Sequence, residues 1–151
     1  MRALALAAAL AAGLSAASAP PPEPQGNCAV CGMFVANFPD WASAISFKDG
    51  TTAWFDGPKD LFACLLDLGR YAPRRKAADI VSIRVKDYYG LAPIDGRKAF
   101  YAMGSDVMGP MGRELVPFAS EADARDFLKD HKGQRILGFQ EVTPAVLKAL
   151  E

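Results

Sequence analysis

The alternation of hydrophobic and polar residues in the first half of the chain predicts short strands and one helix. Residues 41–47 and 51–56 show the period-two pattern of strands, and the Gly-containing turn between them indicates a hairpin. Residues 57–69 carry apolar side chains at helical spacing, with a proline at the start and a glycine at the end. Residues 79–86 alternate again and predict a third strand.

The second half of the chain repeats this order of elements. Strand patterns cover residues 97–104, 114–118 and 135–142, and a helical pattern lies between the last two. The sequence therefore predicts an α+β fold made of two ββαβ units that form one compact, two-lobed domain. The first unit is expected over residues 28–90 and the second over residues 91–151.

The first residues have the features of a secretory signal peptide. Arg2 precedes an uncharged Ala/Leu-rich run over residues 3–14, and small residues follow. This run is shorter than the roughly 20 apolar residues that a membrane-spanning helix needs. We expect residues 1–19 to be a signal peptide, residues 20–27 to be a Pro-rich leader, and the mature protein to be soluble in the periplasm. The polar residues before Cys28 give no support for a lipid anchor there.

The charge balance and the single histidine argue against two classes of protein, nucleic-acid-binding proteins and enzymes with a catalytic triad. Lys and Arg together number 17, as do Asp and Glu, so the formal net charge is zero. This balance argues against a nucleic-acid partner, which usually requires a basic excess. His131 is the single histidine, and its position at the end of a predicted helix favours a surface role. A catalytic triad is hard to assemble from such a chain, so we expect the protein not to be an enzyme.

Sulfur is concentrated in two segments of the chain. The motif Cys28-Ala29-Val30-Cys31-Gly32-Met33 begins the predicted domain, and Met103, Met108 and Met111 lie close together in and beside a Gly/Pro-rich loop. Each of these methionines has a glycine next to it, which lets the backbone turn a thioether toward a common centre. Cu(I) is a soft ion that prefers thiolate and thioether ligands. The pattern therefore favours a Cu(I) site, with edge packing of the methionines as the alternative.

Two further interpretations of the Cys28-x-x-Cys31 pair are a structural zinc site and a redox dithiol. A structural zinc site needs four ligands, whereas the three cysteines and one histidine of this chain are scattered. A dithiol of the thioredoxin type lies between a strand and a helix, and no strand is predicted before this pair. Cys64 lies in the middle of a predicted helix and is interpreted as a buried thiol.

Several short motifs resemble the NosL family of copper-binding accessory proteins. They are Cys31-Gly32-Met33, Trp41 with Ile45, Phe55-Asp56-Gly57 with Lys59-Asp60, Asp87-Tyr88-Tyr89, and Gly109-Pro110-Met111-Gly112 followed by Glu114-Leu115 and Pro117-Phe118. The last string is the most specific, and the resemblance extends from Cys28 to about Val142. It implies two ββαβ units and a periplasmic Cu(I) chaperone. Its implied partners are nitrous oxide reductase or the ABC-type machinery that assembles it.

Carried over by position, the family's Cys-Gly-Met motif falls on Cys31–Met33, and the methionine-rich loop supplies further candidates. Cys28 is an additional cysteine compared with many members, and it either joins the metal site or forms a disulfide with Cys31. The expected metal ligands are Cys28, Cys31, Met33, Met108 and Met111. The alternative function is a periplasmic thiol–disulfide oxidoreductase that uses Cys28 and Cys31. A third interpretation is an adaptor that docks on a membrane transporter.

Overall fold

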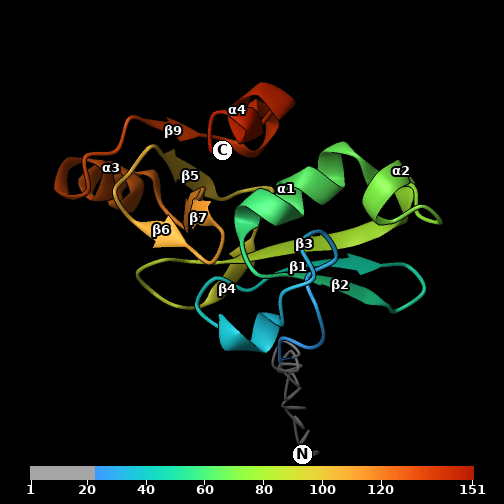
Figure 1. Ribbon diagram of the computed structural model, residues 1–151. Helices are drawn as coiled ribbons and strands as arrows, with labels where there is room; N and C mark the ends of the chain where they lie inside the picture. The colour runs from blue at the N-terminus through green and yellow to red at the C-terminus, as the bar shows by residue number, and fades with distance from the viewer. Residues whose placement is uncertain (1–22) are drawn as a thin grey trace, which may run out of the picture.

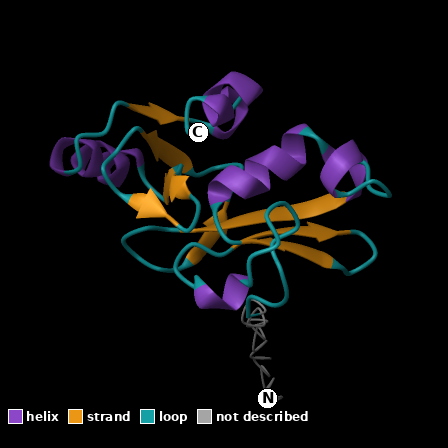
Figure 2. Ribbon diagram, in the orientation of Figure 1, coloured by secondary structure: helices purple, strands orange, loops and turns teal. Residues whose placement is uncertain are grey.

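The computed structural model describes residues 23–151 (Figure 1), so the predicted signal peptide over residues 1–19 lies outside the described residues. The chain contains both helices and strands, and the strands form small separate sheets (Figure 2). This arrangement confirms the predicted α+β fold class. Within residues 23–151, every helix is too short or too polar to cross a bilayer.

The larger sheet has four strands in the order β2-β1-β3-β4, and all neighbouring strands are antiparallel. Its strands are β1 (Ser43–Phe47), β2 (Thr52–Phe55), β3 (Ile80–Lys86) and β4 (Pro93–Asp95). β1 directs Ile45 and Phe47 into the larger hydrophobic cluster, and Ala44 on its other face is also buried. The sequence analysis did not predict β4, because its three residues are exposed or half-exposed and none is buried.

The smaller sheet has three antiparallel strands in the order β8-β5-β9. They are β5 (Phe100–Met103), β8 (Val116–Phe118) and β9 (Arg135–Leu137). β5 comes first in the chain among these three strands and lies in the middle of the sheet. In the same way, β1 comes before β2 and β3 in the chain and lies between them in the larger sheet. A duplicated ββαβ unit predicts this shared order, and the division at residues 28–90 and 91–151 stays a prediction.

Two principal helices cover the sheets. α1 (Pro58–Leu66) packs on β1 and β2, and α3 (Glu121–Asp130) packs across all three strands of the smaller sheet. Ser120 caps α3, because its hydroxyl accepts a hydrogen bond from the Asp123 N–H at 3.1 Å. The remaining short helices are α2 (Leu68–Tyr71), α4 (Pro144–Lys148), η1 (Val35–Asn37), η2 (Ala77–Asp79) and η3 (Phe139–Glu141).

Two elements differ from the prediction in their extent. The strand expected over residues 135–142 stops at Leu137, because Gly138 begins a 3-10 turn and donates its N–H to the Glu141 carboxylate at 2.6 Å. The loop expected over residues 104–113 contains a small hairpin. Its strands are β6 (Met108–Gly109) and β7 (Gly112–Arg113). Gly112 has φ +87°, a conformation that favours glycine at the turn.

β5 lies between two hydrophobic clusters. Tyr101 and Met103 belong to a larger cluster that contains β1, α1 and α4 side chains, whereas Ala102 belongs to a smaller cluster beneath α3. Both faces of β5 are therefore covered, with alternate residues serving different clusters. The larger cluster draws on both predicted units, so they share a core.

Candidate metal centre

The two cysteines of the motif lie in a tight loop that enters the domain. The Cys28 N–H donates to Met33 O at 2.7 Å, and the Gly32 N–H donates back to Cys28 O at 3.0 Å. Gly32 has φ +80°, which reverses the chain between the second cysteine and Met33. A further hydrogen bond from the Ala29 N–H to Trp54 O ties the loop to β2. The loop thereby holds its thiols in a fixed place next to the end of β2.

Two carboxylates meet this loop at the junction between β2 and α1. Asp56 directly follows β2, Gly57 caps α1, and Asp60 lies in the first helical turn. Acidic side chains are favoured there because the N-terminal end of a helix carries partial positive charge. The local fold thus places two carboxylates four residues apart beside the cysteine loop.

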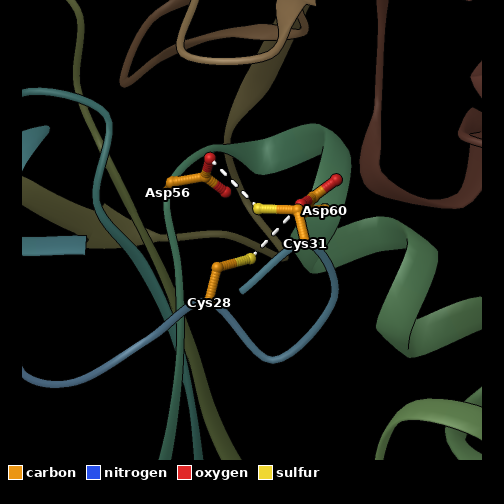
Figure 3. Close-up of side chains that lie close together, drawn as sticks. All are labelled: Cys28, Cys31, Asp56 and Asp60. Carbon is orange, nitrogen blue, oxygen red and sulfur yellow. Dashed lines mark hydrogen bonds between the residues drawn. The ribbon is translucent and has the colours of Figure 1, made fainter. Parts of the chain in front are cut away.

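Cys28, Cys31, Asp56 and Asp60 form a compact group, called here the Cys/Asp cluster (Figure 3). The Cys28 thiol donates to Asp60 Oδ2 at 3.2 Å, and the Cys31 thiol donates to Asp56 Oδ2 at 3.4 Å. One ligand atom from each residue lies within 4.8 Å of the others. Cys31 is partly exposed whereas the other three are buried, so an ion can reach the cluster from the Cys31 side.

Burial controls the protonation of the cluster. Desolvation raises the pKa of the Cys31 thiol from 9.0 to about 11 and raises the pKa of the Cys28 thiol further still. Burial also raises the pKa of the Asp60 carboxyl. Both thiols are therefore protonated at neutral pH, and all three cysteines of the chain are free. A metal ion that binds the two sulfurs must displace their protons.

The candidate methionines are divided between two places. Met33 is partly buried and belongs to the same loop as the cysteines. Met108 and Met111 lie on the β6–β7 hairpin, with 55% and 46% of their surfaces exposed. The structure therefore brings Cys28 and Cys31 together, while the roles of the three methionines as ligands stay predictions.

Lys59 and Glu114 fasten the β6–β7 hairpin to the first turn of α1. The Lys59 ammonium donates to Met111 O at 2.9 Å and to Arg113 O at 3.0 Å. The Glu114 carboxylate accepts the N–H groups of Lys59 at 2.6 Å and of Leu115 at 2.8 Å. The β6–β7 hairpin is thus attached to α1 at Lys59, the residue directly before Asp60 of the Cys/Asp cluster.

Glu114 is a buried carboxyl between two glycines. A Cβ on Gly57 would collide with Glu114 Oε2, and a Cβ on Gly109 would lie 2.9 Å from Glu114 Cγ. Desolvation raises the pKa of Glu114 from 4.5 to about 8. Glycine at both positions therefore lets the hairpin and the helix approach the same buried side chain.

Sequence reasoning missed Asp56 and Asp60 as members of the site, although both lie in motifs that carry the family resemblance. Carboxylates are too common for spacing alone to single them out. The other candidates behave as interpreted. Cys64 is fully buried in α1. His131 follows the last residue of α3 and stacks on the Phe127 ring, with ring centroids 4.4 Å apart.

Comparison with known proteins identifies the family of the chain. The NosL family model matches residues 21–147. The copper-binding lipoprotein NosL of Stutzerimonas stutzeri is 31% identical over 135 residues, which cover 81% of this chain and 64% of that protein. The chain therefore spans less than two thirds of that relative's length.

One solved structure agrees with this assignment. The crystal structure of the copper chaperone NosL from Shewanella denitrificans matches with a TM-score of 0.67 and 26% identity, covering 83% of this chain and 99% of that one. The solution NMR structure of apo-NosL from Achromobacter cycloclastes has a TM-score of 0.47 and 27% identity, covering 70% of this chain and 87% of that one. The family-model match covers most of the chain and shows that this protein belongs to the NosL family.

Proposed function

We propose that this protein is a periplasmic Cu(I) metallochaperone, and not an enzyme, that delivers copper for the maturation of nitrous oxide reductase. The observation that carries the proposal is the convergence of the Cys28 and Cys31 sulfurs in one loop. Solved and curated relatives described as a copper chaperone and a copper-binding lipoprotein support it. Two thiolates are preferred ligands of the soft Cu(I) ion, which tolerates two or three ligands.

Met33 and one of the hairpin methionines complete the proposed ligand set. Met33 follows the cysteines within the same hydrogen-bonded loop. Lys59 attaches the hairpin of Met108 and Met111 to α1, whose first turn carries part of the Cys/Asp cluster. The exposed thioethers of the hairpin and the partial exposure of Cys31 suit transfer, because an acceptor protein can replace weak ligands one at a time.

A competition titration with a chromophoric Cu(I) chelator tests the metal assignment. Wild-type protein is expected to bind Cu(I) much more tightly than the Cys28→Ser/Cys31→Ser/Met33→Ala variant. Cys64→Ala is the matched control, because this buried cysteine of α1 is not a member of the Cys/Asp cluster, and the affinity of the variant should equal that of the wild type. Equal affinity of the wild type and the triple variant would contradict the proposal. Affinity should fall as the pH drops, because protons compete for the thiolates.

A thiol–disulfide oxidoreductase is the second candidate, and the electrostatics of the cluster disfavour it. Such enzymes need a thiolate at neutral pH, which requires a lowered thiol pKa. Here burial raises the pKa of Cys31 to about 11, and two carboxyl groups lie next to the thiols. We expect no insulin reduction by the protein. The Met33→Leu variant separates the functions, since it weakens Cu(I) binding and leaves any dithiol activity intact.

The client is tested by copper transfer. Protein loaded with Cu(I) should restore activity to copper-free nitrous oxide reductase when the assembly machinery is present, whereas the cysteine-free variant should not. Cell fractionation tests the periplasmic location. Restored activity with free Cu(I) at the same rate would remove the need for this protein as the donor.

A further inference from the structure

Several exposed apolar side chains gather around one open pocket, and no member of the Cys/Asp cluster lines it. The pocket has a volume of about 460 Å³. It is called here the aromatic pocket, and its lining includes Asp40, Trp41, Tyr88, Tyr89, Leu91 and Met108. Tyr89, Leu91 and Met108 are all exposed. Large apolar side chains that gather at the surface in this way are typical of a face that binds a partner.

Three separate segments of the chain build the aromatic pocket. Trp41 precedes β1, the two tyrosines lie in the turn between β3 and β4, and Met108 begins β6. The ring centroids of Trp41 and Tyr88 lie 6.1 Å apart, and those of Tyr88 and Tyr89 lie 5.6 Å apart. The ring planes are tilted by 53° and 56°, so the three rings do not stack flat and their faces point in different directions.

Asp87 fixes the turn that carries both tyrosines. Its buried carboxylate accepts the Gly90 N–H at 2.6 Å through Oδ2 and the Ala119 N–H at 2.7 Å through Oδ1. The Tyr88 N–H donates to Pro117 O at 2.9 Å, which ties the turn to β8. The aromatic rings are therefore held in place before any partner binds, which lowers the entropic cost of association.

Leu91 has an unusual backbone conformation at the edge of the same pocket. Its φ is +51°, in the left-handed region that brings the Cβ of a leucine close to a backbone carbonyl oxygen. Its side chain stays 51% exposed, so burial within the described chain offsets little of this strain. A partner that covers Leu91 would supply the missing burial. This observation is separate from the aromatic rings and also indicates a partner at the pocket.

The unpaired charge around the aromatic pocket is negative. Asp40 lines the pocket. Partial desolvation raises the pKa of the Tyr89 hydroxyl, and the negative charge of Asp130 on α3 adds to this shift. Within residues 23–151, neither Asp40 nor Asp130 forms an ion pair, whereas Arg125 and Lys129 are each paired with an acidic residue of α3 itself. The pocket therefore suits a positively charged group.

We propose that the aromatic pocket is a docking site for a partner protein that inserts an arginine side chain into it. A guanidinium is planar and stacks on aromatic faces, and it also forms charge-assisted hydrogen bonds with carboxylates. The lysine ammonium is a compact, strongly hydrated charge and suits aromatic walls less well. Arginine, tryptophan and tyrosine also supply much of the binding energy at protein interfaces. Because Tyr89 and Met108 are exposed, a side chain that projects from another protein can enter the pocket.

The docking site goes beyond the proposed copper function and does not depend on it. Met108 belongs both to the aromatic pocket and to the β6–β7 hairpin, so a partner docked there lies beside a thioether of the proposed copper site. Contact through the aromatic rings needs no metal, and docking can therefore be measured in the metal-free protein.

The experiment titrates the reduced, metal-free full chain with a blocked pentapeptide that has arginine between glycines, followed by NMR. The chain has two tryptophans, whose indole N–H signals are assigned with the Trp54→Phe variant. The Trp41 signal should shift and saturate, whereas the Trp54 signal should stay in place, because Trp54 does not line the pocket. A citrulline peptide, which keeps the shape of arginine without its charge, should give no saturating shift. A lysine peptide should bind more weakly by about threefold or more.

Substitutions test the two features of the pocket separately. Asp40→Asn/Asp130→Asn should bind the arginine peptide about fivefold more weakly through loss of two charges. Glu23→Gln/Glu151→Gln is the matched control, because it removes the same charge from exposed positions outside the pocket lining, and it should keep the wild-type affinity. Tyr89→Leu keeps the apolar bulk but loses the aromatic face, and should weaken binding by about threefold. Melting curves check that each variant is folded.

Four results would overturn the proposal. They are equal affinity for the arginine and citrulline peptides, equal affinity for the arginine and lysine peptides, a saturating shift at Trp54 instead of Trp41, and wild-type affinity in the Asp40→Asn/Asp130→Asn variant. Failure of Cu(I) binding in the separate titration would leave the peptide result intact.

Discussion

Replacing the buried Glu114 with glutamine should remove a pH dependence from the stability of the metal-free protein. Burial raises the pKa of Glu114 from 4.5 to about 8 in the folded state, whereas the solvated carboxyl of the unfolded chain titrates near its ordinary value. Between these pH values the folded protein holds a proton that the unfolded chain has released. The stabilisation is therefore fully present below pH 4.5 and is lost as the pH rises toward 8.

The size of the effect follows from the pKa difference. Each pH unit inside the interval lowers the free energy of unfolding by about 1.4 kcal/mol. The whole interval from 4.5 to about 8 is worth about 5 kcal/mol, and the part between pH 5 and 7 about 2–3 kcal/mol. This loss is large beside a typical domain stability of about 5–15 kcal/mol. Burial also raises the pKa of Asp60, which acts in the same direction and leaves a smaller slope in the variant.

Urea denaturation between about pH 5 and pH 8, with a chelator and a reductant present, provides the assay. The wild type should lose stability across this range, and Glu114→Gln should remain nearly level, because glutamine can still accept the Lys59 and Leu115 N–H groups. Glu141→Gln is the control. This exposed glutamate also accepts a backbone N–H, at 2.6 Å, and its variant should follow the wild-type slope. Parallel curves for the wild type and Glu114→Gln would refute the reasoning.

Three other substitutions test the packing and the site. Phe127→Ala empties a fully buried position on the inner face of α3 and should cost about 3–5 kcal/mol in chemical denaturation. Cys64→Ala should cost about 1 kcal/mol through a small cavity, also measured by denaturation, with unchanged Cu(I) affinity in the chelator titration. Lys59→Met keeps the aliphatic stem but loses both hydrogen bonds to the hairpin. Amide exchange over residues 108–113, measured by mass spectrometry, should become faster by about tenfold.

The main strands and helices could be predicted because each buries one face. β3 alternates buried and less buried residues in its second half, β1 buries all but one of its residues, and α1 and α3 repeat apolar residues at helical spacing. β4 and the β6–β7 hairpin could not be predicted in the same way. Their residues are largely exposed, and their pairing depends on neighbours and on turn glycines rather than on a hydrophobic pattern.

Of the four residues in the Cys/Asp cluster, the sequence singled out only the two cysteines. Cysteine is rare in this chain, so the Cys28-x-x-Cys31 spacing drew attention by itself. Asp56 and Asp60 are two acidic residues among 17, and nothing local distinguishes them. Their partnership with the cysteines joins positions 25 and 32 residues apart, which only the folded chain brings together.

β5 contributes residues to both hydrophobic clusters, so the two halves of the chain depend on each other for burial of their apolar surface. Tyr101, Leu115 and Leu137 cover apolar surface that belongs mostly to the first half of the chain. A fragment of residues 28–90 would leave that surface open to water, and would gain by associating with a second copy of itself. Joining the halves in one chain makes the same closure intramolecular, so that it no longer depends on protein concentration. With both halves in one chain, the fold can in this way persist when the protein is dilute.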